Sequence, residues 1–408
     1  MRLLKLDLKD IGPFNEGHLN FTNEDGQYNP VTIITGENGT GKTIILDAIR
    51  SLLMGNIKTR NIYANLETST ISCEIIVGDS LIIDCIQSYL KDDRFKEVES
   101  INVNNQAFGF RFSTKNIGGD KWIVNYWTSK TKNDDFSINS LVSLKPEDYL
   151  KNALDGIQSN VEVTALITYF DYLKTSDNPK EKQEGEFLFN ILKDIIKLSL
   201  NGGEFLYVER KTLTPIVSQL GNEVAINQLS SGNLYLIQRL ISLLGQMYSV
   251  YILNPEIALV DLCKTPGLLL IDEAENHLHP KWQKTFLNSI LEIFPNLQII
   301  ATTHSPFIVS SVENAKVFVC KSMINNSIIV DETAQYSNKP IEEVLLSDVF
   351  NTERFNQEIT QLLAARDEAI ASKNNIAKDK IEAQLKSINP TYFSYFDIEK
   401  MMQELVEK

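Results

Sequence analysis

Hydrophobic and polar positions follow two different periods in the first part of the chain. Apolar or alternating runs at 3–8 and 31–34 predict strands, because successive side chains of a strand point to opposite faces. Between 43 and 54 the apolar residues recur every three or four positions, which is the spacing of one helix face. Two alternating runs within 70–88 predict a hairpin. The chain therefore begins with strands that run into a helix and then into a hairpin.

The next region, 89–205, is polar at first and then carries apolar residues at helical spacing. This spacing predicts amphipathic helices, and no heptad repeat is sustained long enough for a long coiled coil. The apolar residues of this stripe are Leu166, Tyr169, Phe170, Leu173, Phe187, Phe189, Ile191, Leu192, Ile195 and Ile196. We expect a mainly helical insertion that has no second phosphate motif.

Beyond residue 205 short apolar runs alternate with helical patterns. This alternation predicts a largely parallel sheet covered by helices. Strands are expected within 205–226 and at 268–271 and 297–301, and helices at 233–248, after Pro280 and after Pro306. The C-terminal stretch is expected to form short helices, including a polar one around 361–385.

Length and composition fit a globular chain of several regions. The 408 residues allow two or three domains or one elaborated α/β domain, and 43% apolar residues suffice for a sizeable core. The patterns divide the chain into an N-terminal lobe at 1–88, the insertion at 89–205, a second lobe at 206–335 and a helical tail at 336–408.

Charge and cysteine content limit the expected binding partners and the expected compartment of the protein. With 39 basic and 53 acidic side chains the net charge is −14, which disfavours wrapping nucleic acid with the whole surface, because that binding neutralises phosphates. No stretch of about 18 apolar residues is free of charge and the N-terminus lacks a signal-peptide pattern, so we expect a soluble, cytoplasmic protein. The scattered cysteines, Cys73, Cys85, Cys263 and Cys320, are expected to be buried thiols.

A complete phosphate-loop motif, G-x-x-x-x-G-K-[ST], joins the strand at 31–34 to the first helix. It reads Gly36-Glu37-Asn38-Gly39-Thr40-Gly41-Lys42-Thr43. Glycines let the backbone curl so that several N–H groups converge on phosphate oxygens, and the helix N-terminus adds positive partial charge. We predict that these residues bind ATP, that Lys42 reaches its β and γ phosphates, and that Thr43 ligates Mg²⁺.

Two carboxylates, Asp272 and Glu273, directly follow the apolar run at 268–271. Ligands of open α/β sheets bind at the carboxyl ends of the strands. Asp272 is predicted to hold Mg²⁺ through water, and Glu273 to act as the general base on the attacking water. A strand that ends in Asp-Glu is by itself often only a strand end, and the phosphate loop is what favours a site.

Three of the four histidines follow closely: His277, His279 and His304. An H-x-H pair with a third histidine could bind zinc. His304 follows the strand at 297–301, however, which places it at the same sheet edge as Asp272, so we prefer a contact with the γ-phosphate. His277 and His279 are expected to shape the loop before the helix that Pro280 opens.

The residues Ser230, Ser231, Gly232 and Asn233 precede an apolar helix. A serine N-cap followed by exposed N–H groups is a candidate second anion site. The alternative is an ordinary capped helix, and only the accompanying motifs favour the anion site.

Taken in order, the phosphate loop, 229–233, Asp272-Glu273, 275–280 and His304 resemble the ABC-type ATPase heads of the RecF/SMC superfamily. The resemblance implies an α/β P-loop fold: a mostly parallel sheet with helices on both faces and an antiparallel N-terminal β layer, here with a helical insertion and a helical C-terminal tail. It also implies a homodimer that sandwiches ATP, in which the signature loop, Ser230 to Asn233, completes the site of the opposite protomer. The amino-acid sequence of 271–280 and 302–306 is most similar to that of the compact ATPases of bacterial anti-phage systems, of the Septu and retron-associated PtuA type.

Two functions follow from this resemblance. The first is a slowly hydrolysing, ATP-gated switch or scaffold for a partner effector, such as a nuclease encoded nearby. The second is a DNA repair or maintenance ATPase of the RecF/SMC kind that binds DNA directly. A transporter subunit would need a membrane partner, and a nuclease within the chain is disfavoured because 305–408 contains no D-x-D pair.

Overall fold

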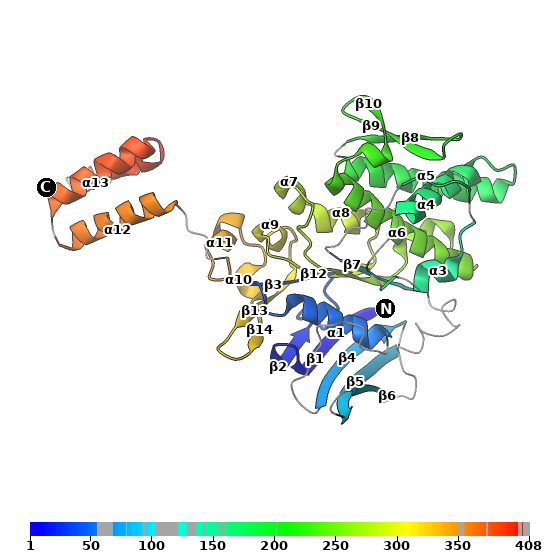
Figure 1. Cartoon of the computed structure of the whole chain (residues 1–408), viewed down its shortest axis with the longest axis horizontal. Coiled ribbons are helices and arrows are strands. Elements are labelled where there is room, and N and C mark those ends of the chain that lie inside the picture. The colour runs from blue at the N-terminus through cyan, green and yellow to red at the C-terminus, as the bar shows by residue number, and fades with distance from the viewer. Residues whose placement is uncertain are drawn as a thin grey trace. The chain divides into compact units, whose positions relative to one another are not determined.

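The computed structural model describes most of the chain in two compact units, Met1–Val344 and Leu345–Lys408 (Figure 1). The residues that it describes are 1–54, 68–78, 80–92, 95–102, 121–128, 136–141, 143–151, 153–154, 156, 160–200, 202–350, 355–372, 374–398 and 402.

The first unit is built around a six-stranded sheet of order β14-β13-β3-β12-β11-β7. All neighbours are parallel except β14, which pairs antiparallel with β13. The strands are β3 (Val31–Gly36), β7 (Ile123–Trp127), β11 (Gly267–Ile271), β12 (Leu297–Thr302), β13 (Lys316–Ser322) and β14 (Ser327–Asp331). The prediction of a mostly parallel sheet is confirmed, and its carboxyl-end edge gathers the ends of β3, β11 and β12.

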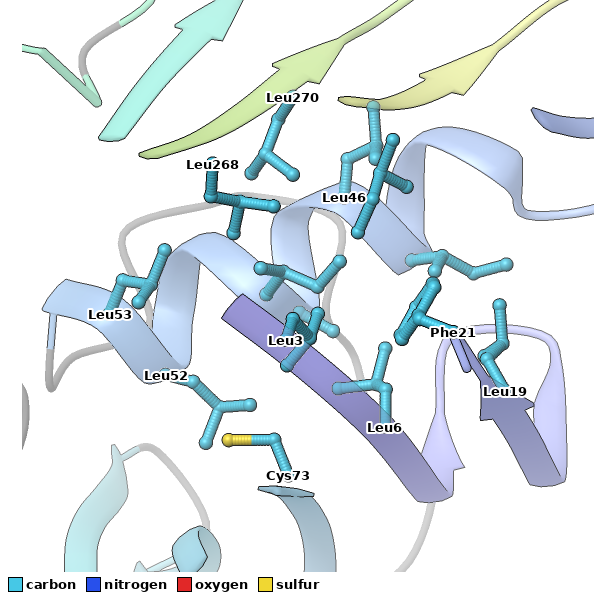
Figure 2. Packing of buried hydrophobic residues seen from close by; sticks show 14 of the residues in the cluster. Leu3, Leu6, Leu19, Phe21, Leu46, Leu52, Leu53, Cys73, Leu268 and Leu270 are labelled. Atoms are coloured by element: carbon cyan, nitrogen blue, oxygen red, sulfur yellow. The ribbon is translucent and has the colours of Figure 1, made fainter. Parts of the chain in front are cut away.

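A second, antiparallel sheet has the order β2-β1-β4-β5-β6. Its strands are β1 (Arg2–Ile11), β2 (Phe14–Asn20), β4 (Thr68–Val77), β5 (Ser80–Asp92) and β6 (Phe95–Asn102). Helix α1 (Lys42–Met54) packs between the two sheets, and Figure 2 shows Leu46 of α1 with Leu6 of β1 and Leu270 of β11 in one buried cluster. This packing on two sides fixes the helix whose first residue ends the phosphate loop.

A layer of helices covers the other face of the central sheet. Helix α6 (Ser231–Leu253) lies at its centre and packs against α3 (Pro146–Lys151), α4 (Asn160–Lys174), α5 (Pro179–Ser199) and β7. Among the described helices α6 alone is long and apolar enough to cross a membrane, yet 83% of its apolar window is buried in the fold. Leu166, Phe170 and Leu192 of the predicted amphipathic stripe are buried in this layer, as expected.

The remaining elements of the first unit are short. A three-stranded sheet of order β10-β9-β8 consists of β8 (Glu204–Glu209), β9 (Thr214–Gln219) and β10 (Asn222–Ala225). The short helices are η1 (Ile226–Gln228), η2 (Leu259–Lys264), α7 (Pro280–Gln283), α8 (Phe286–Ile293), α9 (Pro306–Val309), α10 (Thr333–Tyr336) and α11 (Ile341–Leu345).

Several elements differ from the sequence-based expectation. The region 89–205 contains β6 and β7 as well as helices, and β7 belongs to the central sheet. The β13–β14 hairpin was not predicted, and the helix expected after Pro280 is broken into α7 and α8. Of the cysteines, Cys73 and Cys320 are buried, but Cys263 is only partly buried. The side chain of Cys85 lies outside the described part of the structure.

The second unit is a pair of helices closed by aromatic side chains. It consists of α12 (Gln357–Ala371), α13 (Asn375–Ile388) and η3 (Tyr392–Ser394) around buried Leu385, Phe393 and Phe396. The single polar helix expected around 361–385 is therefore two helices, since Asn374 caps α13 by accepting from the N–H of Ala377 at 3.1 Å. The unit begins at Leu345, later than the predicted 336.

Candidate nucleotide site

The phosphate loop is a backbone cradle between β3 and α1. Gly36, Gly39 and Gly41 have φ values of 140°, 79° and 99°, which side chains other than hydrogen rarely permit. A Cβ on Gly36 would lie 2.2 Å from the carbonyl oxygen of Cys320, and one on Gly41 would lie 2.7 Å from the ring of Phe14. Glycine is thus required at these two positions by close packing behind the loop. The cradle fits the phosphate oxygens that the motif predicts.

Lys42 folds over this loop. Its Nζ donates to the carbonyl oxygens of Gly36 at 3.0 Å and Glu37 at 2.7 Å, and the residue is 7% exposed. Burial lowers the pKa of Lys42, while the nearby Cys320 and the acidic residues of the site oppose that shift. Phosphate oxygens at the loop would offer this buried ammonium charge-assisted hydrogen bonds, which are stronger than its bonds to neutral carbonyl groups.

Asp272 ties the phosphate loop to the neighbouring strand ends. Its Oδ1 accepts from Thr43 Oγ1 at 2.9 Å and from Thr302 Oγ1 at 2.7 Å. Burial raises the pKa of Asp272, an effect that the two hydroxyl hydrogen bonds oppose and that Glu273 and Glu275 reinforce. The hydroxyl of Thr43 and the carboxylate of Asp272 therefore lie side by side, and oxygen ligands of this kind are those that Mg²⁺ prefers.

Glu273 sits on a strained turn directly after Asp272. Its φ is 51°, a left-handed conformation that is costly for a residue with a side chain and that concentrates at functional sites. The turn is held by its N–H, which donates to Thr302 Oγ1 at 2.9 Å, and by its Oε2, which accepts from Asn276 Nδ2 at 2.5 Å. These two hydrogen bonds hold the half-buried carboxylate of Glu273 at the carboxyl-end edge, beside Asp272.

His304 is positioned by Glu275. The carboxylate of Glu275 accepts from Thr303 Oγ1 at 2.6 Å and from the backbone N–H of His304 at 2.8 Å. Burial and the charge of Lys42 lower the pKa of His304 below its usual 6.5, so the imidazole is neutral near pH 7. The structure therefore brings His304 into the same charged cluster as Lys42, Asp272 and Glu273, as the sequence predicted.

Sequence reasoning did not assign a role to Glu275, Thr302 or Thr303. Their hydrogen bonds hold Asp272, Glu273 and His304 in place. The two threonines immediately before His304 could have indicated these roles. Hydroxyl groups at the end of a buried strand need hydrogen-bond partners at the sheet edge. A carboxylate three positions after Asp272 supplies one of these partners.

The signature loop packs against the segment that follows Glu273. A Cβ on Gly232 would lie 2.3 Å from the carbonyl oxygen of His277, and the rings of Tyr235 and His277 are 5.4 Å apart. Ser230 and Ser231 are exposed, and Ser230 Oγ caps α6 by accepting from the N–H of Asn233 at 3.4 Å. No hydrogen bond among the described residues joins this loop to the phosphate loop.

The three histidines of the motifs make separate contacts. His279 Nδ1 accepts from the N–H of Lys281 at 3.3 Å and so caps α7, while the ring of His277 packs against that of Tyr235 at an angle of 41°. His304 begins the loop held by Glu275. Within the described residues, no group of three or more His, Cys, Asp or Glu side chains is arranged to hold a metal ion. The expected role of His277 and His279 in shaping the loop before α7 agrees with these contacts.

The comparison with known families decides the class of this site. Residues 31–310, which span the phosphate loop, the signature loop, the two carboxylates and His304, match the family described as "AAA domain, putative AbiEii toxin, Type IV TA system". The chain belongs to this family. Its membership confirms the ATPase expected from the phosphate loop, and the matched range covers every residue predicted to act on the nucleotide.

Individual relatives are similar along most of the chain. The "Retron Vc95 probable ATPase" of Vibrio cholerae serotype O1 biovar El Tor is 25% identical over 85% of this chain and 78% of its own length. The "Septu protein PtuA" of Bacillus thuringiensis is 25% identical over 95% of this chain and 94% of its own length. The resemblance to retron-associated and Septu ATPases, expected from the motifs, is thereby confirmed.

Among solved structures, the SMC head domain from Thermotoga maritima is 16% identical, with a TM-score of 0.46, over 81% of this chain and 99% of that chain. An SMC head bound to the C-winged helix domain of ScpA is also 16% identical, with a TM-score of 0.47, over 82% and 99% of the two chains. The assignment of this ATPase family rests on the sequence match and on the contacts of the site residues.

Proposed function

We propose that two copies of this ATPase close on ATP and Mg²⁺, each pairing its phosphate loop with the signature loop of the other copy. The observation that carries the proposal is that the signature loop exposes its serine side chains and, among the described residues, makes no hydrogen bond to the phosphate loop. Lys42, Asp272, Glu273 and His304 share the carboxyl-end edge, whereas the exposed Ser230 and Ser231 belong to a loop that packs on His277. A second protomer can supply the exposed hydroxyls and helix N-terminus that the first site lacks.

Each residue of the edge has a chemical role in this proposal. Lys42 and the N–H groups of 36–43 bind the phosphates, and Thr43 and Asp272 hold Mg²⁺, which neutralises phosphate charge when bound. Glu273 accepts a proton from the attacking water, and the neutral His304 donates a hydrogen bond to the γ-phosphate. Ser231, Gly232 and Asn233 of the partner contact the same phosphate from the opposite side.

The proposed biological role is a switch in a cytoplasmic anti-phage defence system. Its support is the similarity to the "Retron Vc95 probable ATPase" and to "Septu protein PtuA" along most of the chain. The ATP-bound dimer holds a partner effector, such as a nuclease, and slow hydrolysis changes its release or activity. A net charge of −14 favours protein docking over sequence-independent DNA binding.

The second unit is the proposed docking site for that effector. It has a core of its own around Phe393, and it exposes Ile376 at 85% and Ile398 at 60%. A partner that covers these side chains would remove their apolar area from water, which favours binding. The nucleotide site does not require these side chains, since all its residues lie within Met1–Val344.

Dimerisation is tested with Glu273→Gln, whose amide fits the site but accepts no proton. We expect this variant to sediment as a dimer with ATP and Mg²⁺, and as a monomer with ADP or when combined with Lys42→Ala. A sedimentation coefficient that ATP leaves unchanged would rule out the nucleotide-dependent dimer.

Effector docking is tested by removing 346–408, a cut that keeps the buried Tyr336 and Val344 in the ATPase unit. The shortened protein should bind ATP like the parent but fail to co-purify the product of the neighbouring gene. Retention of that product would refute the docking site. Tight, salt-sensitive binding of plain duplex DNA by the full chain would instead favour the RecF/SMC-like function.

A further inference from the structure

The β13–β14 hairpin extends past the phosphate loop. In the parallel pairing of β13 with β3, Cys320 is opposite Gly36, so the residues after Cys320 continue beyond the end of β3. The carbonyl oxygen of Cys320 packs on Gly36 so closely that no Cβ would fit between them. The turn between β13 and β14 therefore projects from the same edge at which the nucleotide site lies.

This turn is apolar and exposed. Ile324 is 100% exposed and Met323 is 53% exposed, although the turn itself is ordered by the N–H of Met323, which donates to the carbonyl oxygen of Asn326 at 2.8 Å. Directly beside this turn, the N–H of Ser327 donates to the carbonyl oxygen of Pro13 at 2.8 Å, which anchors the hairpin to the turn between β1 and β2. The hairpin also lies against β2 (Figure 1). Two large apolar side chains are thus held in water next to the phosphate loop.

The order of the strands gives the bound nucleotide a direction. Asp272, Glu273 and His304 follow β11 and β12, which lie on one side of β3, and β13 lies on the other side. The γ-phosphate has to face the carboxylates, because the water is activated there. A base directed away from these carboxylates would lie on the side of β13, whose turn carries Met323 and Ile324.

We propose that Met323 and Ile324 form the wall against which the nucleoside base packs. This inference rests on the proposed function, because it takes ATP as the ligand of the phosphate loop. A purine has a large apolar face, and covering it with the two exposed side chains removes apolar area from water on both partners. The hairpin tip contributes affinity for the base and none for the phosphates.

The test compares two ligands that share the phosphate loop, ATP and inorganic tripolyphosphate, each with Mg²⁺, by isothermal titration calorimetry. In the variant Met323→Ser/Ile324→Ser the Kd for ATP should rise about fivefold to twentyfold, from the loss of apolar contact area. The Kd for tripolyphosphate should stay that of the parent. Ile324 is fully exposed, so its substitution removes no packing from the fold.

A matched control is Leu220→Ser, which changes an equally apolar residue, 95% exposed, at the tip of the β9–β10 hairpin. It should leave both Kd values unchanged. An equal loss of affinity for ATP and for tripolyphosphate in the double variant would overturn the proposal, since the hairpin tip would then act on the phosphate loop.

An unchanged Kd for ATP together with loss of the ATP-dependent dimer would also overturn it, in favour of a contact between protomers. A parent protein that binds neither ligand would refute the proposed function itself, and this inference with it.

Discussion

The nucleotide edge and the second unit are built from opposite kinds of contact. At the edge, one oxygen of Asp272 accepts from Thr43 and from Thr302, residues that are 229 and 30 positions away along the chain. In the second unit, Nε of Arg366 donates to Glu382, which is only 16 positions away along the chain. The guanidinium carbon of Arg366 lies 4.3 Å from the ring centre of Phe396. The edge depends on the whole first unit, whereas the second unit is held by its own helices. Substitutions at the edge should therefore change nucleotide chemistry, and those in the second unit should not.

The largest effect is expected from Lys42→Ala. The change removes the ammonium placed over the phosphate loop, and a hydrogen bond to a charged group contributes about 1.5–3 kcal/mol, so the Kd for ATP should rise about tenfold to 150-fold. Lys264→Ala removes an exposed lysine that pairs with Asp261 and serves as the control. Calorimetric titration that finds parental affinity in Lys42→Ala would refute the phosphate-loop assignment.

Glu275→Ala should lower kcat about tenfold, because Thr303 and the N–H of His304 lose their shared acceptor and His304 loses its position. KM for ATP should change less than twofold, since Glu275 binds Thr303 and His304 and is not part of the phosphate loop. Glu275→Gln keeps a carbonyl oxygen acceptor and should recover part of the rate. Equal losses in both variants, or a loss confined to KM, would contradict a positioning role.

Asp272→Asn should stabilise the protein when Mg²⁺ is absent. Because the pKa of Asp272 is raised, the folded state holds the proton more tightly than the unfolded state, and the free energy of unfolding falls as pH rises through that pKa. At pH 7 with EDTA the variant should therefore have a higher Tm than the parent, and the difference should shrink toward pH 4.

Asp261→Asn, which changes an exposed carboxylate, is the control and should not move Tm. A lower Tm for Asp272→Asn at pH 7 would mean that the hydrogen bonds from Thr43 and Thr302 outweigh the cost of the buried charge.

The smallest effect on nucleotide chemistry is expected from Phe393→Ala. Phe393 is 0% exposed, so its removal should destabilise the second unit by about 3–5 kcal/mol. ATP affinity and turnover should stay within about twofold of the parent. Helicity and ATP turnover should be followed in the same sample during heating. A first loss of helicity that leaves turnover unchanged would show that the second unit unfolds independently of the first. A matching fall in turnover would show that the second unit supports the nucleotide edge.

The motifs of the nucleotide edge could be read from sequence because their chemistry limits the residue types. A glycine with φ of 140° at residue 36, a lysine at 42 and a carboxylate at 272 each have few substitutes. The role of Glu275 could not be read in the same way, because it acts through Thr303 and His304 and depends on how β11 and β12 pair.

The two missed elements differ in how strong their local signal is. Strand β7 is only five residues long and places Asn125 among apolar neighbours, so its pattern is weak, although its aromatic and β-branched residues favour a strand. The β13–β14 hairpin turns at Met323-Ile324-Asn325-Asn326, and its two asparagines are ordinary turn residues, so a local signal for this hairpin was present and was missed. For β7, by contrast, pairing with β11 in the central sheet decides the strand.

The central claim, that each site is completed by the signature loop of the other copy, is tested most directly by mixing two inactive variants. Lys42→Ala lacks phosphate binding, and Ser231→Arg blocks the exposed signature loop. In a mixed dimer one intact phosphate loop faces one intact signature loop, so mixing the variants in equal amounts should restore ATP turnover to about one quarter of the parental rate if dimers form at random. Turnover that stays at the level of the separate variants would contradict the account.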